Sequence, residues 1–269
     1  MLRNLNEIIG YTLQATDGDI GRCEDFLFDD QFWIVRYMLA DTNTWLPGAK
    51  KTLISPNSVG NPDCETTHLP IALSRELIKN SPLLDEHQPV SREYEANFFD
   101  YYGYDYYWMG AEQRRSYTDP IASAKLSAEV SIADSEEIND ALSIEEGHLR
   151  SAKEVQGFSI KSLDGDIGHV DGFILNDVNW TIEYLIVDTR NWLPSSRNVL
   201  ISPNWLSSVN WVEKSVCVGL TSEQITNSPK FDINKSINPD IENLLRNFYA
   251  ELTKQLKSKK DRHENSQGF

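Results

Sequence analysis

Two pairs of aspartates, each with one residue between them, are the first groups in this sequence whose spacing could hold a metal ion. They occur as Asp17-Gly18-Asp19 and again as Asp164-Gly165-Asp166. A calcium loop of the EF-hand type needs further oxygen ligands at fixed positions and a glutamate at position twelve, but the twelfth residue counted from Asp17 is Phe28. Glycine accepts a positive φ, and aspartate bonds to nearby backbone. We therefore interpret both segments as hairpin turns, with Ca²⁺ ligation as the lesser alternative.

The other residues with chemical potential are the histidines and cysteines, and none stands at metal-ligand spacing from another. The sequence also lacks a phosphate loop ending in Gly-Lys-Ser/Thr, a GxGxxG segment and a GxSxG segment. We therefore expect no catalytic residue, no cofactor and no metal, and we predict that the protein is not an enzyme. The residues considered are His68, His87, His148, His169, His263, Cys23, Cys64 and Cys217.

The fold prediction rests on a repeat at an offset of 147 residues. Residues 2–102 (the first repeat) align without a gap to residues 149–249 (the second repeat), with 32 identities over 101 positions. A gapless match of this length indicates one structural unit used twice. Two copies are too few for a solenoid, so two packed domains are expected. We hypothesise that they pack face to face as a pseudo-two-fold pair, like a fused homodimer.

The elements that position these residues are short strands joined by tight turns. In the first repeat, alternating apolar residues predict strands over residues 8–16, from the turn to near 28, over 32–40, 52–54 and 67–73, and then a short helix over 74–80. Trp33 and its counterpart Trp180 are placed on strand faces in the core. Such a unit protects its edge strands best by closing into a small barrel. The predicted fold is mostly β, with two small β-barrels.

A helical arm is expected after each barrel. It begins at Ser91 in the first repeat and at Asn238 in the second, where Asn-Pro-Asp is a favourable helix start. Residues 103–148 have no counterpart and become rich in acidic residues, which predicts a solvated linker. The predicted parts are therefore barrel one over 1–90, an arm and linker over 91–148, barrel two over 149–237, and a C-terminal helix and polar tail over 238–269.

Charge and hydropathy limit the partners. The formal net charge is −16, and such an acidic surface repels phosphate backbones, so no nucleic-acid partner is expected. No apolar run approaches the ~20 residues of a membrane span, and no signal-peptide core follows the first residues. Three cysteines give no disulfide framework, which favours a reducing cytoplasm.

The residues now assembled resemble the PRC-barrel family, which is named for the cytoplasmic domain of the photosynthetic reaction-centre H chain. The similar segments are Asp17-Gly18-Asp19-Ile20-Gly21 with Phe26-Leu27-Phe28-Asp29, the segment from Trp33 to Asp41, and the segment from Leu73 to Pro82, with its counterpart from Leu220 to Pro229. The resemblance implies small β-barrels that serve as interaction modules. The arm at Ser91 looks like that of stand-alone bacterial members with two such barrels. Unlike the H chain, this sequence has no transmembrane helix.

Aromatic residues are the candidates for an interaction surface. Trp45 and Trp192 precede proline in equivalent loops, either as lids over a barrel mouth or at an interface, and these readings have equal weight. The aromatic stretch of the first arm either anchors a partner or wraps its own barrel, and we favour the second. The candidate interaction residues are Trp45, Trp192, Tyr94, Tyr101, Tyr102, Tyr104, Tyr106, Tyr107 and Trp108.

The sequence is compatible with three functions. The first is a non-catalytic scaffold or regulatory protein that binds protein partners, with homo-oligomerisation left open. The second, implied by the resemblance, is an accessory subunit of a photosynthetic or other electron-transfer complex. The third and least favoured is a small-ligand binder or enzyme that uses a barrel mouth.

Overall fold

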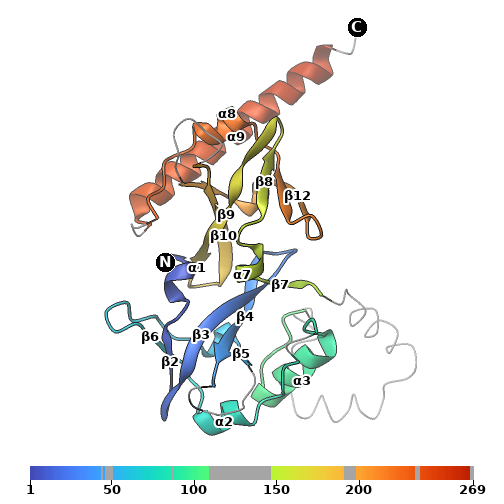
Figure 1. Ribbon diagram of the computed structural model, residues 1–269. Helices are drawn as coiled ribbons and strands as arrows, with labels where there is room; N and C mark the ends of the chain where they lie inside the picture. Colours follow the sequence, from blue (N-terminus) through green and yellow to red (C-terminus); the bar gives the residue numbers. More distant parts are fainter. Residues whose placement is uncertain are drawn as a thin grey trace, which may run out of the picture. The chain divides into compact units, whose positions relative to one another are not determined.

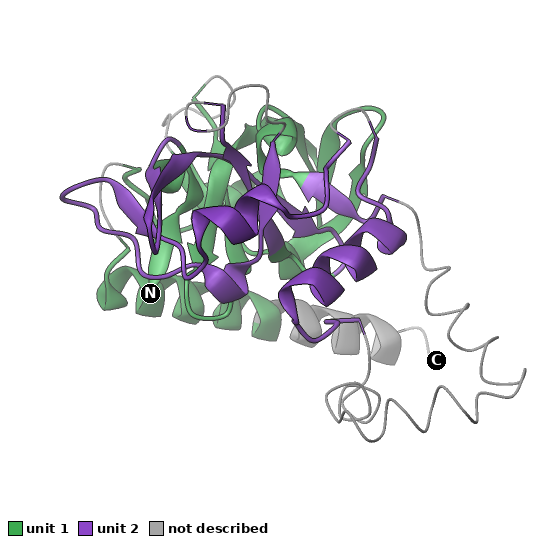
Figure 2. Cartoon of the chain, turned by 90° about the horizontal axis from the view of Figure 1, so that it is seen from below, with its two compact units in different colours: residues 1–9, 32–35, 151–269 green, residues 10–31, 36–150 purple. Residues whose placement is uncertain are grey.

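The computed structural model describes residues 1–43, 45, 51–85, 88–108, 147–190, 198–233 and 237–266, with side chains of the last helix described as far as Lys254. The prediction of a mostly β chain with a few short helices is confirmed (Figure 1). The chain divides into two compact units (Figure 2). Unit 1 contains residues 1–9, 32–35 and 151–269, and unit 2 contains residues 10–31 and 36–150. The chain therefore passes from one unit to the other four times.

Unit 2 is built around a mixed set of strands in the order β4-β3-β2-β6, with β5 beside β4 and β7 beside β3. Antiparallel β2 and β3 pair Ala15 with Gly18, which confirms the hairpin turn predicted at Asp17. Parallel pairing joins β2 to β6. The elements are β2 (Thr12–Ala15), β3 (Gly18–Asp29), β4 (Ile34–Asp41), β5 (Thr52–Ile54), η1 (Pro56–Ser58), β6 (His68–Pro70), α2 (Arg75–Lys79), α3 (Arg92–Tyr102) and β7 (Leu149–Ser151).

Unit 1 repeats this plan with strands in the order β12-β13-β8-β9-β10, with β11 beside β10 and β1 beside β9. Parallel pairing again occurs, here between β13 and β8. The elements are β1 (Leu2–Asn4), α1 (Leu5–Ile8), α7 (Ala152–Val155), β8 (Ser159–Ser162), β9 (Gly165–Asn176), β10 (Thr181–Asp188), β11 (Asn198–Ile201), η2 (Pro203–Trp205), β12 (Leu206–Asn210), β13 (Ser215–Val218), α8 (Ser222–Thr226) and α9 (Pro239–Ser266).

The first strand of each repeat lies in the unit formed mainly by the other repeat. In unit 1, β1 pairs with β9, with Leu2 opposite Asn176, and Arg3 binds Asp177 at 2.6 Å. In unit 2, β7 pairs with β3, and Arg150 binds Asp30 at 2.8 Å. The two ion pairs are the same contact displaced by 147 residues. The expected boundaries at residues 90 and 148 do not describe this exchange of first strands.

One glycine in each repeat is required by close backbone packing. Gly21 has a φ of 126°, and a Cβ built there would lie 1.9 Å from the carbonyl oxygen of Asp41. Gly168 has a φ of 147°, and its Cβ would lie 2.0 Å from the carbonyl oxygen of Asp188. Only a residue without a side chain fits such positions. The Asp-Gly-Asp-Ile-Gly motif therefore encodes both a turn and a close approach between strands.

Two details of the strand prediction are wrong. The segment over 8–16 is not one strand, because Gly10 has a φ of 90° and separates helix α1 from β2. Trp33 and Trp180 precede β4 and β10 with φ of 56° and 58°, so they are turn residues rather than members of a strand face. Their carbonyls accept equivalent bonds within unit 1, from Ile182 N to Trp33 O at 2.7 Å and from Val35 N to Trp180 O at 2.8 Å.

Each helical arm packs on its own unit. Helix α3 begins after Ser91, whose side chain accepts a bond from the Tyr94 N–H, and it buries Phe98 and Phe99. Helix α9 buries Leu245 against the core of unit 1, which includes Ile174, Ile186, Leu200, Phe231 and Ile237. Helix α8 begins with a capping box, in which the Thr221 and Gln224 side chains each bond to the other residue's backbone N–H. Over the part of the chain that is described, no helix has both the length and the apolar character needed to cross a membrane.

Candidate functional site

The aromatic stretch of the first arm forms a cluster with the core of unit 2. Its centre is Phe99, whose ring lies 5.4 to 6.1 Å from four later aromatic rings. Tyr37 on β4 meets Phe98 edge to face at 5.2 Å. The polypeptide after α3 folds back over the helix, because its aromatic side chains can cover apolar surface and still bond through their hydroxyls. The four rings around Phe99 are those of Tyr104, Tyr106, Tyr107 and Trp108.

The candidate tyrosines are half-buried or buried, and most of their hydroxyls bond to groups of unit 2. Tyr94 donates to the Pro82 carbonyl at 3.1 Å, and Tyr101 donates to the Leu77 carbonyl at 2.8 Å. Tyr106 is 8% exposed and donates to Asp100. Tyr104 shares a bond with the Ser58 hydroxyl. These contacts accord with an arm that wraps its own unit.

Of the two loop tryptophans, Trp45 packs within its own unit. Trp45 is half-buried, and the guanidinium of Arg75 lies 4.8 Å from the centre of its ring, which is cation–π distance. The ring thus packs against helix α2 of its own unit. Trp192 lies outside the described residues.

A buried carboxylate, Glu95, stands at the base of the cluster and is fully enclosed, with 0% exposure. Its Oε1 accepts bonds from Tyr37 at 2.9 Å and Tyr107 at 2.7 Å, and its Oε2 accepts from Arg92 at 2.7 Å. The fourth neighbour is His148, whose Nε2 lies 3.5 Å from Oε2. These five residues are called the Glu95 network below. They join α3, β4, the segment after α3 and the residue before β7.

Tyr107 connects the parts of the network. Its ring is stacked under Arg36 at 3.8 Å and lies 5.4 Å from Arg92. Its hydroxyl also lies 2.8 Å from His148 Nε2. A hydroxyl has one proton. Because that proton goes to Glu95, His148 Nε2 is the donor to Tyr107.

The electrostatics of the network follow from its burial. Burial raises the pKa of Glu95 above the ordinary value, and Arg92 together with the tyrosine bonds offsets part of that rise. Burial, followed by the nearby Glu95 carboxylate, also raises the pKa of Tyr37 and of Tyr107. Both phenols therefore stay protonated and can only donate to Glu95. The arrangement is a set of satisfied bonds around one carboxylate.

The Glu95 network is not built for chemistry on a substrate. Glu95 is inaccessible and His148 is only 5% exposed, so no reactant reaches the carboxylate without unfolding the arm. A hollow of about 480 Å³ elsewhere in unit 2 is lined by residues without ionisable groups, namely Gln14, Ala15, Thr16, Gly18, Gly60, Pro70, Ile71 and Ala72. The network instead fixes the arm and the start of β7 to the unit.

Sequence reasoning placed the aromatic residues but missed the Glu95 network. A signal was present, because Glu95 stands three and four residues before Phe98 and Phe99, on the apolar stripe of the helix, with Arg92 one turn earlier. A carboxylate on a buried stripe needs partners. His148 could not be found this way, because it lies 53 residues from Glu95 along the chain.

Comparison of the sequence with models of known protein families gives no match, and comparison with curated proteins gives none.

Proposed function

We propose that this chain is a non-catalytic protein-interaction protein built from two PRC-type barrels, paired by the exchange of their first strands. The resemblance in the Asp-Gly-Asp-Ile-Gly segments supports the family. The equivalent ion pairs of Arg3 and Arg150 support a pseudo-two-fold relation between the repeats. The enclosed Glu95 network argues against catalysis at the most deeply buried charged group.

Helix α9 is the element that binds the partner in this proposal. Its buried stripe contains Leu245 and Leu252. Beside that stripe, Leu244 is 58% exposed, and Phe248, one turn further, is half-buried. Apolar residues four apart are the usual anchors by which a helix binds an apolar groove or helix of a partner. Helix α3 offers no comparable site, since its exposed residues, Glu93, Asn97 and Asp100, are polar.

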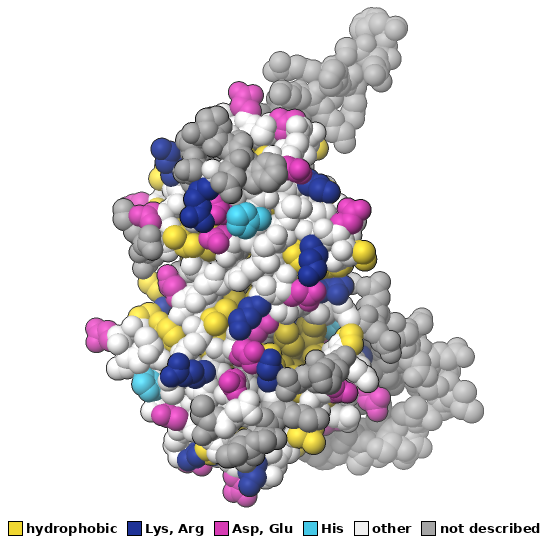
Figure 3. Space-filling model, viewed as in Figure 1, with side chains coloured by type: hydrophobic (Ala, Val, Ile, Leu, Met, Phe, Trp, Pro, Cys, Tyr) yellow, Lys and Arg dark blue, Asp and Glu magenta, His cyan; other side chains and the backbone are white. Residues whose placement is uncertain are grey.

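The surroundings of this stripe fit a protein partner. Two exposed ion pairs, Glu242 with Arg246 and Glu251 with Lys254, lie on the same helix. A polar rim around an apolar centre is the usual anatomy of a protein interface. Figure 3 shows hydrophobic side chains on the visible face in small patches among charged groups of both signs. The occupant we infer is an apolar helix face of another protein.

The test is affinity capture from native lysate with the full chain, compared among three proteins. Leu244→Glu removes the exposed anchor, and Val212→Glu changes a side chain that is 93% exposed in the β12–β13 turn. We expect a stoichiometric partner to be retained by the parent and by V212E and lost by L244E. Equal capture by all three would refute the role of α9. A visible absorption band in purified protein would instead favour the electron-transfer alternative.

A further inference from the structure

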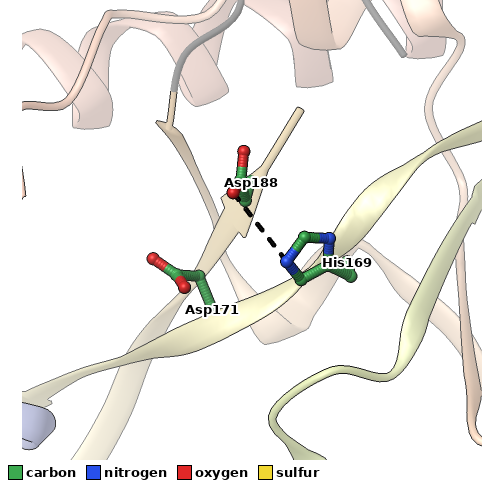
Figure 4. A group of neighbouring side chains, drawn as sticks. All are labelled: His169, Asp171 and Asp188. Carbon is green, nitrogen blue, oxygen red and sulfur yellow. Dashed lines mark ion pairs between the residues drawn. The ribbon is translucent and has the colours of Figure 1, made fainter. Parts of the chain in front are cut away.

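Three metal-ligating side chains meet in unit 1, outside the sites described so far. His169 and Asp171 are two apart on β9, where the register with β10 shifts at Asp171, and Asp188 lies opposite His169 at the end of β10. One ligand atom from each lies within 4.8 Å of the others. Figure 4 shows His169 and Asp188 turned toward one another from neighbouring strands, with Asp171 beside them on β9.

Asp188 is held by an arginine from its own turn. It is 2% exposed, its Oδ1 accepts from the Arg190 N–H at 2.9 Å, and its Oδ2 accepts from Arg190 Nε at 2.7 Å. His169 Nε2 lies 3.8 Å from the same Oδ2. The Arg190 side chain is 67% exposed, so it can leave for solvent. Among the described residues, the Asp171 carboxylate makes neither a hydrogen bond nor an ion pair.

The equivalent positions of the first repeat carry residues that do not form a metal-ligand set. The counterparts of His169, Asp171, Asp188 and Arg190 are Arg22, Glu24, Asp41 and Asn43. There, Glu24 binds Lys51 at 2.7 Å, and Asp41 accepts bonds from Asn43. One permanent cation, Lys51, thus pairs with one of the two carboxylates, and an arginine, Arg22, occupies the position of His169. In the second repeat, an imidazole replaces Arg22, and Asn198 replaces Lys51.

The second repeat has two carboxylates, one permanent cation in Arg190, and an imidazole nitrogen in place of the guanidinium of Arg22. We propose that His169, Asp171 and Asp188 bind a divalent transition metal such as Zn²⁺, and that Arg190 competes with the metal for Asp188. Imidazole nitrogen with two carboxylate oxygens is a donor set that suits Zn²⁺, and three protein ligands leave a position for water. The first repeat cannot bind in this way, because arginine offers no lone pair.

The test is titration of the chelator-treated full chain with ZnCl₂ by calorimetry, and with CoCl₂ by absorption. We expect one saturable site per chain. His169→Arg, which installs the residue of the first repeat, should weaken binding by at least about tenfold. Arg190→Ala should tighten it about fivefold, because a competing charge at the surface is removed.

A histidine in unit 2 provides the matched control. His68→Gln removes an imidazole that lies outside the proposed site and should leave the affinity unchanged, with circular dichroism confirming that each variant is folded. Absence of saturable binding, or equal affinity for the parent and H169R, would overturn the site. An R190A variant that binds no tighter than the parent would overturn the competition by Arg190.

Discussion

Replacing Glu95 by alanine should destabilise the protein strongly, because it breaks the Glu95 network at its centre. The change leaves Arg92, which is 11% exposed, without its carboxylate, and it leaves the fully buried Tyr37 hydroxyl without its acceptor. Breaking a buried ion pair by removing one partner costs about 3–5 kcal/mol. We therefore expect a loss of about 4 kcal/mol in the free energy of unfolding. Glu95→Gln keeps one acceptor oxygen and should cost about 2 kcal/mol.

The repeat supplies a matched control at the position 147 residues later. Glu242 is the counterpart of Glu95, but its side chain is 39% exposed and pairs with the exposed Arg246. Such pairs on a helix surface contribute about 0.3–0.5 kcal/mol. Glu242→Ala should therefore change stability by less than about 1 kcal/mol.

Urea unfolding followed by circular dichroism measures both variants. With a slope of about 2 kcal/mol per molar urea, a loss of 4 kcal/mol lowers the midpoint by about 2 M. Similar midpoints for E95A and E242A would refute the reasoning, because the network would then contribute no more than a surface pair.

Further predictions concern backbone and pH. Gly21→Ala and Gly168→Ala should each lower the free energy of unfolding, measured by thermal unfolding, by more than about 3 kcal/mol. Gly165 has a φ of 148° but open space around a Cβ built there, so Gly165→Ala should cost only the backbone strain of about 1–3 kcal/mol. Equal losses for the three variants would show that the close approach to the carbonyl is unimportant. Burial tends to raise the pKa of Asp177, but bonds from the N-terminal ammonium and Arg3 hold that pKa below its ordinary value. The stability that these bonds give is therefore present above about pH 3.9 and is lost as the pH falls through the lower folded-state pKa of Asp177. In acid titrations of stability, this part of the pH dependence should be absent from the Asp177→Asn variant. The pKa of Glu95 is raised, so its contribution to stability declines as the pH rises through the folded-state value; a parent and an E95Q variant with the same slope of stability between pH 4 and 7 would contradict this.

Local patterns in the sequence were sufficient for many elements. The turn at Asp17, the helix after Ser91 and the cap at Thr221 follow from residue chemistry that acts within a few positions. The positions of Trp33 and Trp180 in turns could not be predicted from local sequence patterns. Tryptophan is rare at positive φ, and alternation with its neighbours is typical of a strand.

The exchange of first strands was also beyond local reasoning. Leu2-Arg3 and Leu149-Arg150 are identical pairs, so either could pair with β3 or β9 on the evidence of sequence alone. The aromatic candidates were found by composition, which does not tell whether a side chain points toward its own unit or toward solvent. The structure shows most of their hydroxyls bonded within unit 2. The Glu95 network depends on His148, whose proximity only the tertiary fold creates.

The pairing of β1 with β9 has a consequence for how the chain is made. Leu2 must wait for Asn176, which leaves the ribosome 174 residues later. At about 5–20 residues per second, that delay is on the order of 10 to 35 s. During this interval strands β2 to β6 of unit 2 have been made, while β1 (Leu2–Asn4) still lacks its partner strand β9. We therefore expect slower translation in this interval to lower the yield of unit 1.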